Sequence, residues 1–188
     1  RLRELVMRLN ECLSGSRFLR GLNKIGGIAK DIPADANEAL RKSLDELAKD
    51  FSEVIEIARD SSTLLNRLRG TGTLTRRIAE DHGVAGVPAR AVGINADARR
   101  DYRYAAYDEI KFEIALENTG DVQARFNVRK KEVMSSFGIL KQALNNLTND
   151  NEKSISPKFS LAKNSYAVGI VEGWRGDIVY LISTDERG

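Results

Sequence analysis

The N-terminal third of the chain has the apolar spacing of amphipathic helices. Between residues 2 and 13, leucine and valine recur every three or four positions, and Gly15 follows as a left-handed C-terminal cap. A second apolar stripe runs from residue 40 to residue 58, preceded by Asp35 and Glu38 at the spacing of a capping box. The pattern therefore predicts two amphipathic helices, of which the second is long.

The C-terminal half of the chain changes character three times. Residues 111–116 alternate apolar and polar side chains, which predicts one short strand or an extended arm. From Gly120 to Leu147 the apolar positions return to intervals of three, four and seven, as in a long helix. After a polar stretch, two β-rich runs are separated by Trp174-Arg175-Gly176, which is typical of a hairpin with a short turn.

These elements predict a mainly α fold that is α+β in total: a bundle of long helices with a C-terminal β-hairpin and a long central loop region rich in glycine and arginine. We expect one domain, with residues 1–147 as the bundle, 148–160 as a linker and 161–188 as the hairpin. The chain begins directly in an amphipathic pattern without methionine and ends in a turn. We therefore interpret it as an internal fragment of a longer subunit.

The central region, residues 70–108, differs most from a generic helical sequence. It holds glycines that favour positive φ, and seven arginines lie between Arg69 and Arg103. Acidic residues are interspersed, so internal ion pairs explain the arginines better than nucleic-acid contacts, and we expect Asp97 and Asp101 to pin the loop with the neighbouring arginines. Within it, Thr75 is expected to cap a short helix that ends at His82.

Composition narrows the chemistry that the chain can perform unaided. Thirty basic and 27 acidic residues give a net charge of +3, too balanced to indicate a nucleic-acid binder. Cys12 and His82 are the only cysteine and histidine, which excludes a zinc site built from several Cys and His ligands. We expect no metal ligand and no cofactor-binding residue here, with Cys12 buried as a small hydrophobe and His82 at a helix C-terminus. No apolar run approaches the length of a membrane span.

Arg175 is the strongest candidate for a catalytic residue in this sequence. At the tip of a tight hairpin, a guanidinium is held with little freedom and can place positive charge beside a reacting centre. From the spacing alone, an exposed turn arginine without a function is the better explanation, and only a resemblance to a known family changes that.

Several motifs together resemble one family. GTGxLT, ARAxGI at residues 89–94, DARRD, YAAYD ending at Asp108, GDVxxRxxVRxxEV from Gly120 and the VEGxRG turn occur in order. In order and spacing they are similar to the large subunit of membrane-bound, energy-converting nickel–iron hydrogenases, including formate hydrogenlyase, and to its relative, the 49 kDa (D) subunit of NADH:quinone oxidoreductase. The resemblance runs from Ser14 to the end.

The resemblance implies an oxidoreductase subunit of an electron-transport complex, peripheral on the cytoplasmic side of the membrane. Its partners would be a small iron–sulfur subunit, which carries the clusters, and membrane subunits. The family's nickel–iron centre is bound by two CxxC pairs that this chain lacks, so the fragment would be inactive alone. By resemblance, Arg175 would lie above that centre and assist cleavage of dihydrogen, although Trp174 replaces the family's Pro, Ala or Ser.

Two departures separate the branches of the family. Leu19 replaces a histidine that, in the quinone-reducing relatives, hydrogen-bonds the terminal iron–sulfur cluster, and Lys24 replaces an arginine. Both favour a hydrogenase or formate hydrogenlyase over the D subunit, with which quinone binding and NAD binding are associated. A D subunit of NADH:quinone oxidoreductase remains the alternative, and a structural docking module for neighbouring subunits is another.

Overall fold

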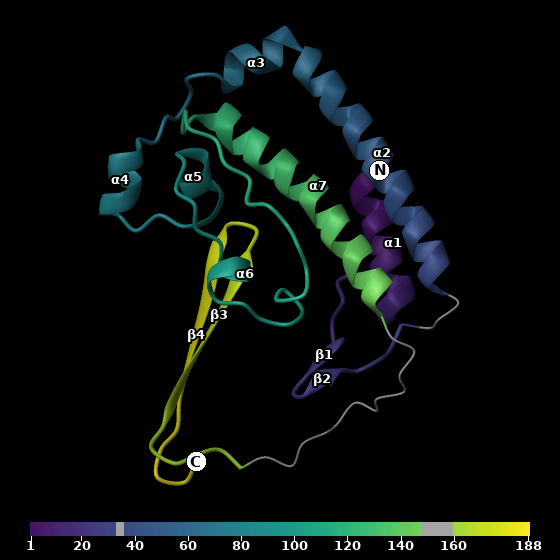
Figure 1. The fold of residues 1–188 in the computed structure, drawn as a ribbon, viewed down its shortest axis with the longest axis vertical. Coiled ribbons are helices and arrows are strands. Elements are labelled where there is room, and N and C mark those ends of the chain that lie inside the picture. Colours follow the sequence, from purple (N-terminus) through teal and green to yellow (C-terminus); the bar gives the residue numbers. More distant parts are fainter. Residues whose placement is uncertain (33–35, 148–159) are drawn as a thin grey trace. The chain divides into compact units, whose positions relative to one another are not determined.

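The computed structural model describes residues 1–32, 36–147 and 160–188. Helices predominate, and two antiparallel hairpins accompany them (Figure 1). The mainly helical α+β class with a hairpin near the C-terminus is confirmed. The chain separates into two compact units, Arg1–Val54 with Leu144–Ser160 and Ile55–Ala143 with Leu161–Gly188. Asp35 of the expected capping box, and the expected linker apart from Ser160, lie outside the described residues.

The first unit is built from α1 (Leu2–Ser14), the small hairpin β1 (Asn23–Lys24) and β2 (Gly27–Ile28), and the start of α2 (Ala36–Asp60). Gly15 ends α1 at φ 77°, and its N–H donates to the Glu11 carbonyl, as the sequence predicts. The apolar stripe of α2 buries Leu40, Leu44 and Leu47. The predicted first and second helices are therefore confirmed.

Cys12 corrects one sequence expectation. Its side chain is exposed instead of buried, although it lies beside the apolar stripe of α1. The neighbouring Glu11 is also exposed, whereas Leu13 is partly buried. The covered face of α1 is therefore narrow, and a position one step off the stripe points to solvent.

The second unit holds α3 (Ser62–Leu68), α4 (Arg76–Asp81), α5 (Gly86–Ala91), α6 (Ala98–Asp101), most of α7 (Val122–Asn146), and the hairpin β3 (Tyr166–Gly173) and β4 (Gly176–Ser183). Short helices α5 and α6 are additional to the sequence prediction. Thr75 caps α4 by accepting from the Ile78 N–H at 3.3 Å, and the exposed His82 ends that helix, both as expected. No helix in the described ranges combines the length and hydrophobicity that crossing a bilayer requires.

The core of the second unit joins α5 to α7. Val87 and Ala91 of α5 pack with Ala124 and Val128 of α7, and all four are at most 1% exposed. Ala115, from the segment before α7, packs against the same cluster. Alanine at two of the four helix positions, Ala91 and Ala124, lets the two helices lie close together.

Residues 111–116 form no strand, so the strand prediction is wrong and the alternative, an arm without a partner strand, fits. The Gln142 side chain of α7 satisfies the backbone of Lys111, since its Oε1 accepts from the Lys111 N–H at 3.0 Å and its Nε2 donates to the Lys111 carbonyl at 2.8 Å. At this residue a side chain supplies the two hydrogen bonds that a neighbouring strand would supply.

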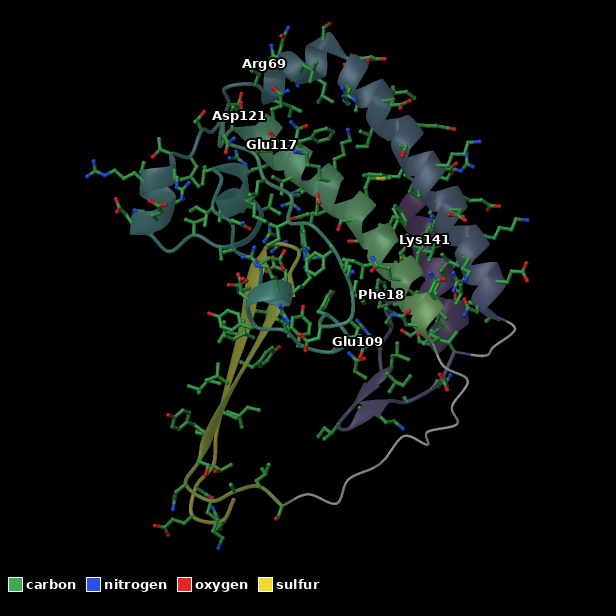
Figure 2. All side chains as sticks on the ribbon, viewed as in Figure 1. Phe18, Arg69, Glu109, Glu117, Asp121 and Lys141 are labelled. Atoms are coloured by element: carbon green, nitrogen blue, oxygen red, sulfur yellow. The ribbon has the colours of Figure 1, made fainter. Side chains whose placement is uncertain are left out.

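Asp121 begins α7 as a buried cap (Figure 2). Its carboxylate accepts from the Ala124 N–H and the Gly70 N–H, both at 2.8 Å, and from the Thr119 hydroxyl at 3.0 Å. Burial raises the pKa of the Asp121 carboxyl, but these hydrogen bonds outweigh burial and hold the pKa below its ordinary value. One side chain thus starts α7 and holds the loop after α3.

We expect Asp121→Ala to lower the free energy of unfolding by about 1–3 kcal/mol, because two backbone N–H groups lose their acceptor. Urea unfolding followed by the fluorescence of Trp174, the only tryptophan, measures this. Asp81→Ala is the matched control, since Asp81 is exposed and lies 3.8 Å from Arg77. That control should change stability by no more than about 0.5 kcal/mol.

The same comparison has a pH dependence with a defined sign. Because folding lowers the pKa of Asp121, its contribution is complete above the ordinary aspartate pKa of about 3.9 and is lost as pH falls through the folded-state pKa. The difference between wild type and Asp121→Ala should therefore shrink in acid below about pH 3.9. Equal stability of the two proteins at pH 7 would contradict the capping role.

The tip of the C-terminal hairpin rests on the first residue of α5. Gly86 has φ +72°, and a Cβ built there would lie 2.5 Å from Gly176 Cα and 2.6 Å from the Arg175 carbonyl oxygen. Two backbones therefore meet with no room for a side chain between them. The turn Trp174-Arg175 takes its position from this contact.

We expect Gly86→Ala to destabilise the chain by about 2–5 kcal/mol, since it combines a left-handed conformation with overlap against the hairpin backbone. Gly83→Ala is the matched control, because Gly83 has φ +59° and the methyl group of an alanine there would meet no atom within 4 Å. It should cost only the conformational penalty of about 1–2 kcal/mol. If urea unfolding gave both variants a similar loss of unfolding free energy, the hairpin tip would not be in close contact with Gly86.

Candidate functional site

A buried guanidinium at the end of α5 organises the candidate site. Arg90 is 2% exposed, and each of its nitrogens has an acceptor. Nε donates to Glu132 Oε1 of α7 at 2.7 Å, Nη2 donates to Glu172 Oε1 of β3 at 2.8 Å, and Nη1 donates to the Ala96 carbonyl at 3.0 Å. Asp97 Oδ2 lies 3.6 Å from Nη1. One arginine therefore connects α5, α7, β3 and the loop before α6.

A second guanidinium completes the pairing on the loop side. Arg99 binds Asp97 in a bidentate manner, through Nε to Oδ1 at 2.9 Å and Nη2 to Oδ2 at 2.7 Å. The hydrogen bonds to Asp97 raise the pKa of Arg99, which stays charged. The Arg99 guanidinium also lies over the Phe112 ring, 4.9 Å from its centroid. Asp97 is thereby fully buried without an unpaired charge.

Glu172 ties the hairpin to this cluster. Its Oε2 accepts from the Ala98 N–H of α6 at 3.0 Å, and its own N–H donates to the Tyr104 hydroxyl at 3.1 Å. Burial raises the pKa of the Glu172 carboxyl, against the opposing effect of the Ala98 N–H and the Arg90 guanidinium. Three carboxylates, Asp97, Glu132 and Glu172, share the two guanidinium groups of Arg90 and Arg99. We call these five residues the Arg90 cluster.

Arg175 lies three residues beyond Glu172, at the exposed tip of the hairpin. Its guanidinium carbon lies over the Trp174 ring at 4.3 Å from the centroid. An open pocket of about 440 Å³ is lined by Trp174 and Gly173 of the tip, by members of the Arg90 cluster and by Arg129 of α7. The hairpin tip therefore lies beside a partly charged pocket, and the exposed Arg175 guanidinium lies over Trp174, one of the residues that line it.

The expected internal ion pairs are confirmed. Among the seven arginines from Arg69 to Arg103, carboxylates pair with Arg76, Arg77, Arg90, Arg99, Arg100 and Arg103. Arg69 donates to the Gln123 side chain at 3.3 Å. Asp97 and Asp101 hold the loop as expected, since the Asp97 N–H donates to Asp101 Oδ2 at 2.9 Å. The pairs of Arg90 and Arg99 are buried and serve the fold of the region, whereas those of Arg76, Arg77 and Arg103 lie on the surface.

Sequence reasoning located Arg175 at the tip of the turn but missed what holds that turn. Arg90, Glu132 and Glu172 all lie inside the motifs ARAxGI, GDVxxRxxVRxxEV and VEGxRG, yet nothing in the sequence pairs them. One signal was present for Arg90, which is the only charged residue in the otherwise apolar or glycine-containing motif of residues 89–94. Such a residue requires a partner when it is buried.

The residues of this chain do not fit a thiolate-bound nickel–iron centre, because Cys12 is its single cysteine and is exposed. In the part of the chain that the structure describes, no group of three or more His, Cys, Asp or Glu side chains could hold a metal ion. The three carboxylates of the Arg90 cluster surround a guanidinium instead.

Known proteins match this chain along nearly its whole length. The D subunit of NADH-quinone oxidoreductase from Dehalococcoides mccartyi is 31% identical over 183 residues, covering 97% of this chain and 50% of the relative. NADH-quinone oxidoreductase subunit 4 of Thermus thermophilus is 33% identical over 145 residues, covering 77% of this chain and 36% of the relative. The chain spans about half the length, or less, of these curated relatives.

Among solved structures, the membrane-bound sulfane sulfur reductase, an archaeal respiratory membrane complex, contains a similar chain. The TM-score is 0.88 at 28% identity, over 98% of this chain and 52% of the other. The family model for the respiratory-chain NADH dehydrogenase 49 kDa subunit matches residues 1–186. The chain therefore belongs to the family of the 49 kDa subunit of respiratory-chain NADH dehydrogenase.

Proposed function

We propose that this chain forms part of the large subunit of a membrane-associated respiratory hydrogenase or formate hydrogenlyase. The observation that carries the proposal is the position of the Arg175 backbone at the hairpin tip, held between the Gly86 contact on one side and the buried Glu172 on the other. A cation held by the fold in advance stabilises charge that separates in a transition state without reorganising. The chain alone lacks the ligands of a metal centre and is inactive by itself in this proposal.

Leu19 supports the hydrogenase branch over the quinone-reducing one. It follows α1 with φ 56° and is 38% exposed, so its side chain is available to a neighbouring subunit. A leucine offers no hydrogen bond to an iron–sulfur cluster, whereas the histidine that the resemblance places there in quinone-reducing relatives does. A leucine in the left-handed region is uncommon, which makes this residue a distinctive feature of the chain.

The second candidate is a D subunit that takes part in quinone reduction, and the names of the similar bacterial subunits favour it. In both proposals the chain docks on a small iron–sulfur subunit and on membrane subunits, at the cytoplasmic side of the membrane. The parent complex, purified from membranes, distinguishes the two. Viologen-linked hydrogen evolution supports the first, and quinone reduction by NADH without hydrogen turnover supports the second.

For Arg175→Lys in the intact parent complex, we expect hydrogen turnover to fall by about 10²–10³-fold while the complex assembles normally. The lysine keeps one positive charge but loses the planar fork and its fixed direction. Arg103→Lys is the matched control, since Arg103 is an exposed arginine paired with Asp108 at 3.1 Å. Unchanged turnover in Arg175→Lys would remove Arg175 from the mechanism.

Glu172→Gln tests whether the Arg90 cluster holds the tip in place. The amide still accepts one hydrogen bond but loses the charge-assisted bond to Arg90, so we expect turnover in the parent complex to fall by roughly tenfold through a small displacement of the turn. Glu80→Gln is the control, because Glu80 forms an Arg–Glu pair of the same 2.8 Å length on the surface, with Arg76. Equal activity of the two variants would contradict a positioning role for the cluster.

A further inference from the structure

Trp174 stands beside Arg175 in the turn, and its ring contacts that guanidinium. The guanidinium carbon lies 4.3 Å from the ring centroid, well inside the range of a cation–π contact. Among the described residues Arg175 forms no ion pair with a carboxylate. The backbone contact at Gly86 fixes where the Arg175 main chain lies, but it leaves the side chain free to rotate.

The same ring is approached by a second guanidinium from another element. Arg129 of α7 lies over the Trp174 ring at 5.5 Å from the centroid. Arg129 and Trp174 both line the pocket of about 440 Å³ beside the Arg90 cluster. The same helix, α7, also supplies Glu132 to that cluster. The Trp174 ring therefore contacts a helix that the cluster holds in place. Through Arg129, the indole of Trp174 connects the hairpin tip to α7.

We infer that Trp174 is the positioning residue for the Arg175 side chain, with Arg129 holding the ring. This inference rests on the proposed function, in which the direction of the Arg175 guanidinium matters for turnover. An aromatic face restricts a long, flexible arginine to the few rotamers that lie over the ring. The resemblance leads us to expect Pro, Ala or Ser at position 174. The tryptophan found there adds a means of orienting the Arg175 side chain to the backbone contact at Gly86.

Two substitutions separate the aromatic face from the bulk of the side chain. Trp174→Phe keeps a smaller π face, and Trp174→Leu keeps an apolar side chain without one. In the intact parent complex we expect Trp174→Leu to lower kcat roughly tenfold with KM unchanged, and Trp174→Phe to stay within about threefold of wild type. In an Arg175→Lys background, Trp174→Leu should cause little further loss, because the residue acts through Arg175.

A second measurement is independent of turnover. Phenylglyoxal modifies accessible arginine side chains, and mass spectrometry of the peptide gives the modification rate of Arg175 in the complex. We expect Arg175 to react several-fold faster in Trp174→Leu than in wild type, with Trp174→Phe close to wild type. Arg129→Met should give an intermediate rate, since the ring keeps its place in the turn but loses its contact with α7.

The outcomes distinguish this inference from the proposed function. Equal modification rates in wild type and Trp174→Leu would overturn the positioning role, whatever the activity of the complex. Equal losses of kcat in the Phe and Leu variants, or a full additional loss in the Arg175→Lys background, would also overturn it. If the wild-type complex turns over no hydrogen while the modification pattern holds, the proposed function fails and the positioning role of Trp174 stands.

Discussion

The buried guanidinium of Arg90 is the interaction on which the second unit depends. It lies 42 residues from Glu132 and 82 residues from Glu172 along the chain, and it bonds to both. A charge removed from water this completely is tolerated only when its donors are all accepted, and loss of one partner leaves an uncompensated charge that costs several kcal/mol. The hairpin, α7 and the central region therefore reach their arrangement together or leave charges unpaired.

This requirement explains how a region of short helices keeps a defined shape. Helices of four to six residues have little stability of their own, since each has few internal hydrogen bonds. Caps and ion pairs replace that stability: Thr75 starts α4, Asp97 starts α6, and Asp121 both starts α7 and holds Gly70. Buried side-chain polar atoms all have partners in the described residues. The central region is thus ordered by side chains and not by long elements.

Three of the motifs on which the resemblance was based also acquire a physical meaning. The arginine of ARAxGI, the last glutamate of the motif that begins at Gly120, and the glutamate of VEGxRG are Arg90, Glu132 and Glu172, three members of the Arg90 cluster. Motifs that are far apart in the chain are therefore the parts of one buried ion-pair network. The network holds the hairpin turn that carries Arg175, whose backbone meets Gly86 and whose guanidinium lies over the Trp174 ring.

The sequence by itself determined the elements whose cause is local. Apolar spacing and caps were sufficient for α1, α2 and α7, for the α4 turn that begins after Thr75, and for the hairpin with Arg175 at its tip, because each depends on residues within a few positions of one another. The tertiary structure alone decided what is non-local. The partners of Arg90, the contact of Gly86 with Gly176, the exposure of Cys12 and the absence of a strand at residues 111–116 all depend on which distant segment lies alongside, and no periodicity encodes that neighbour.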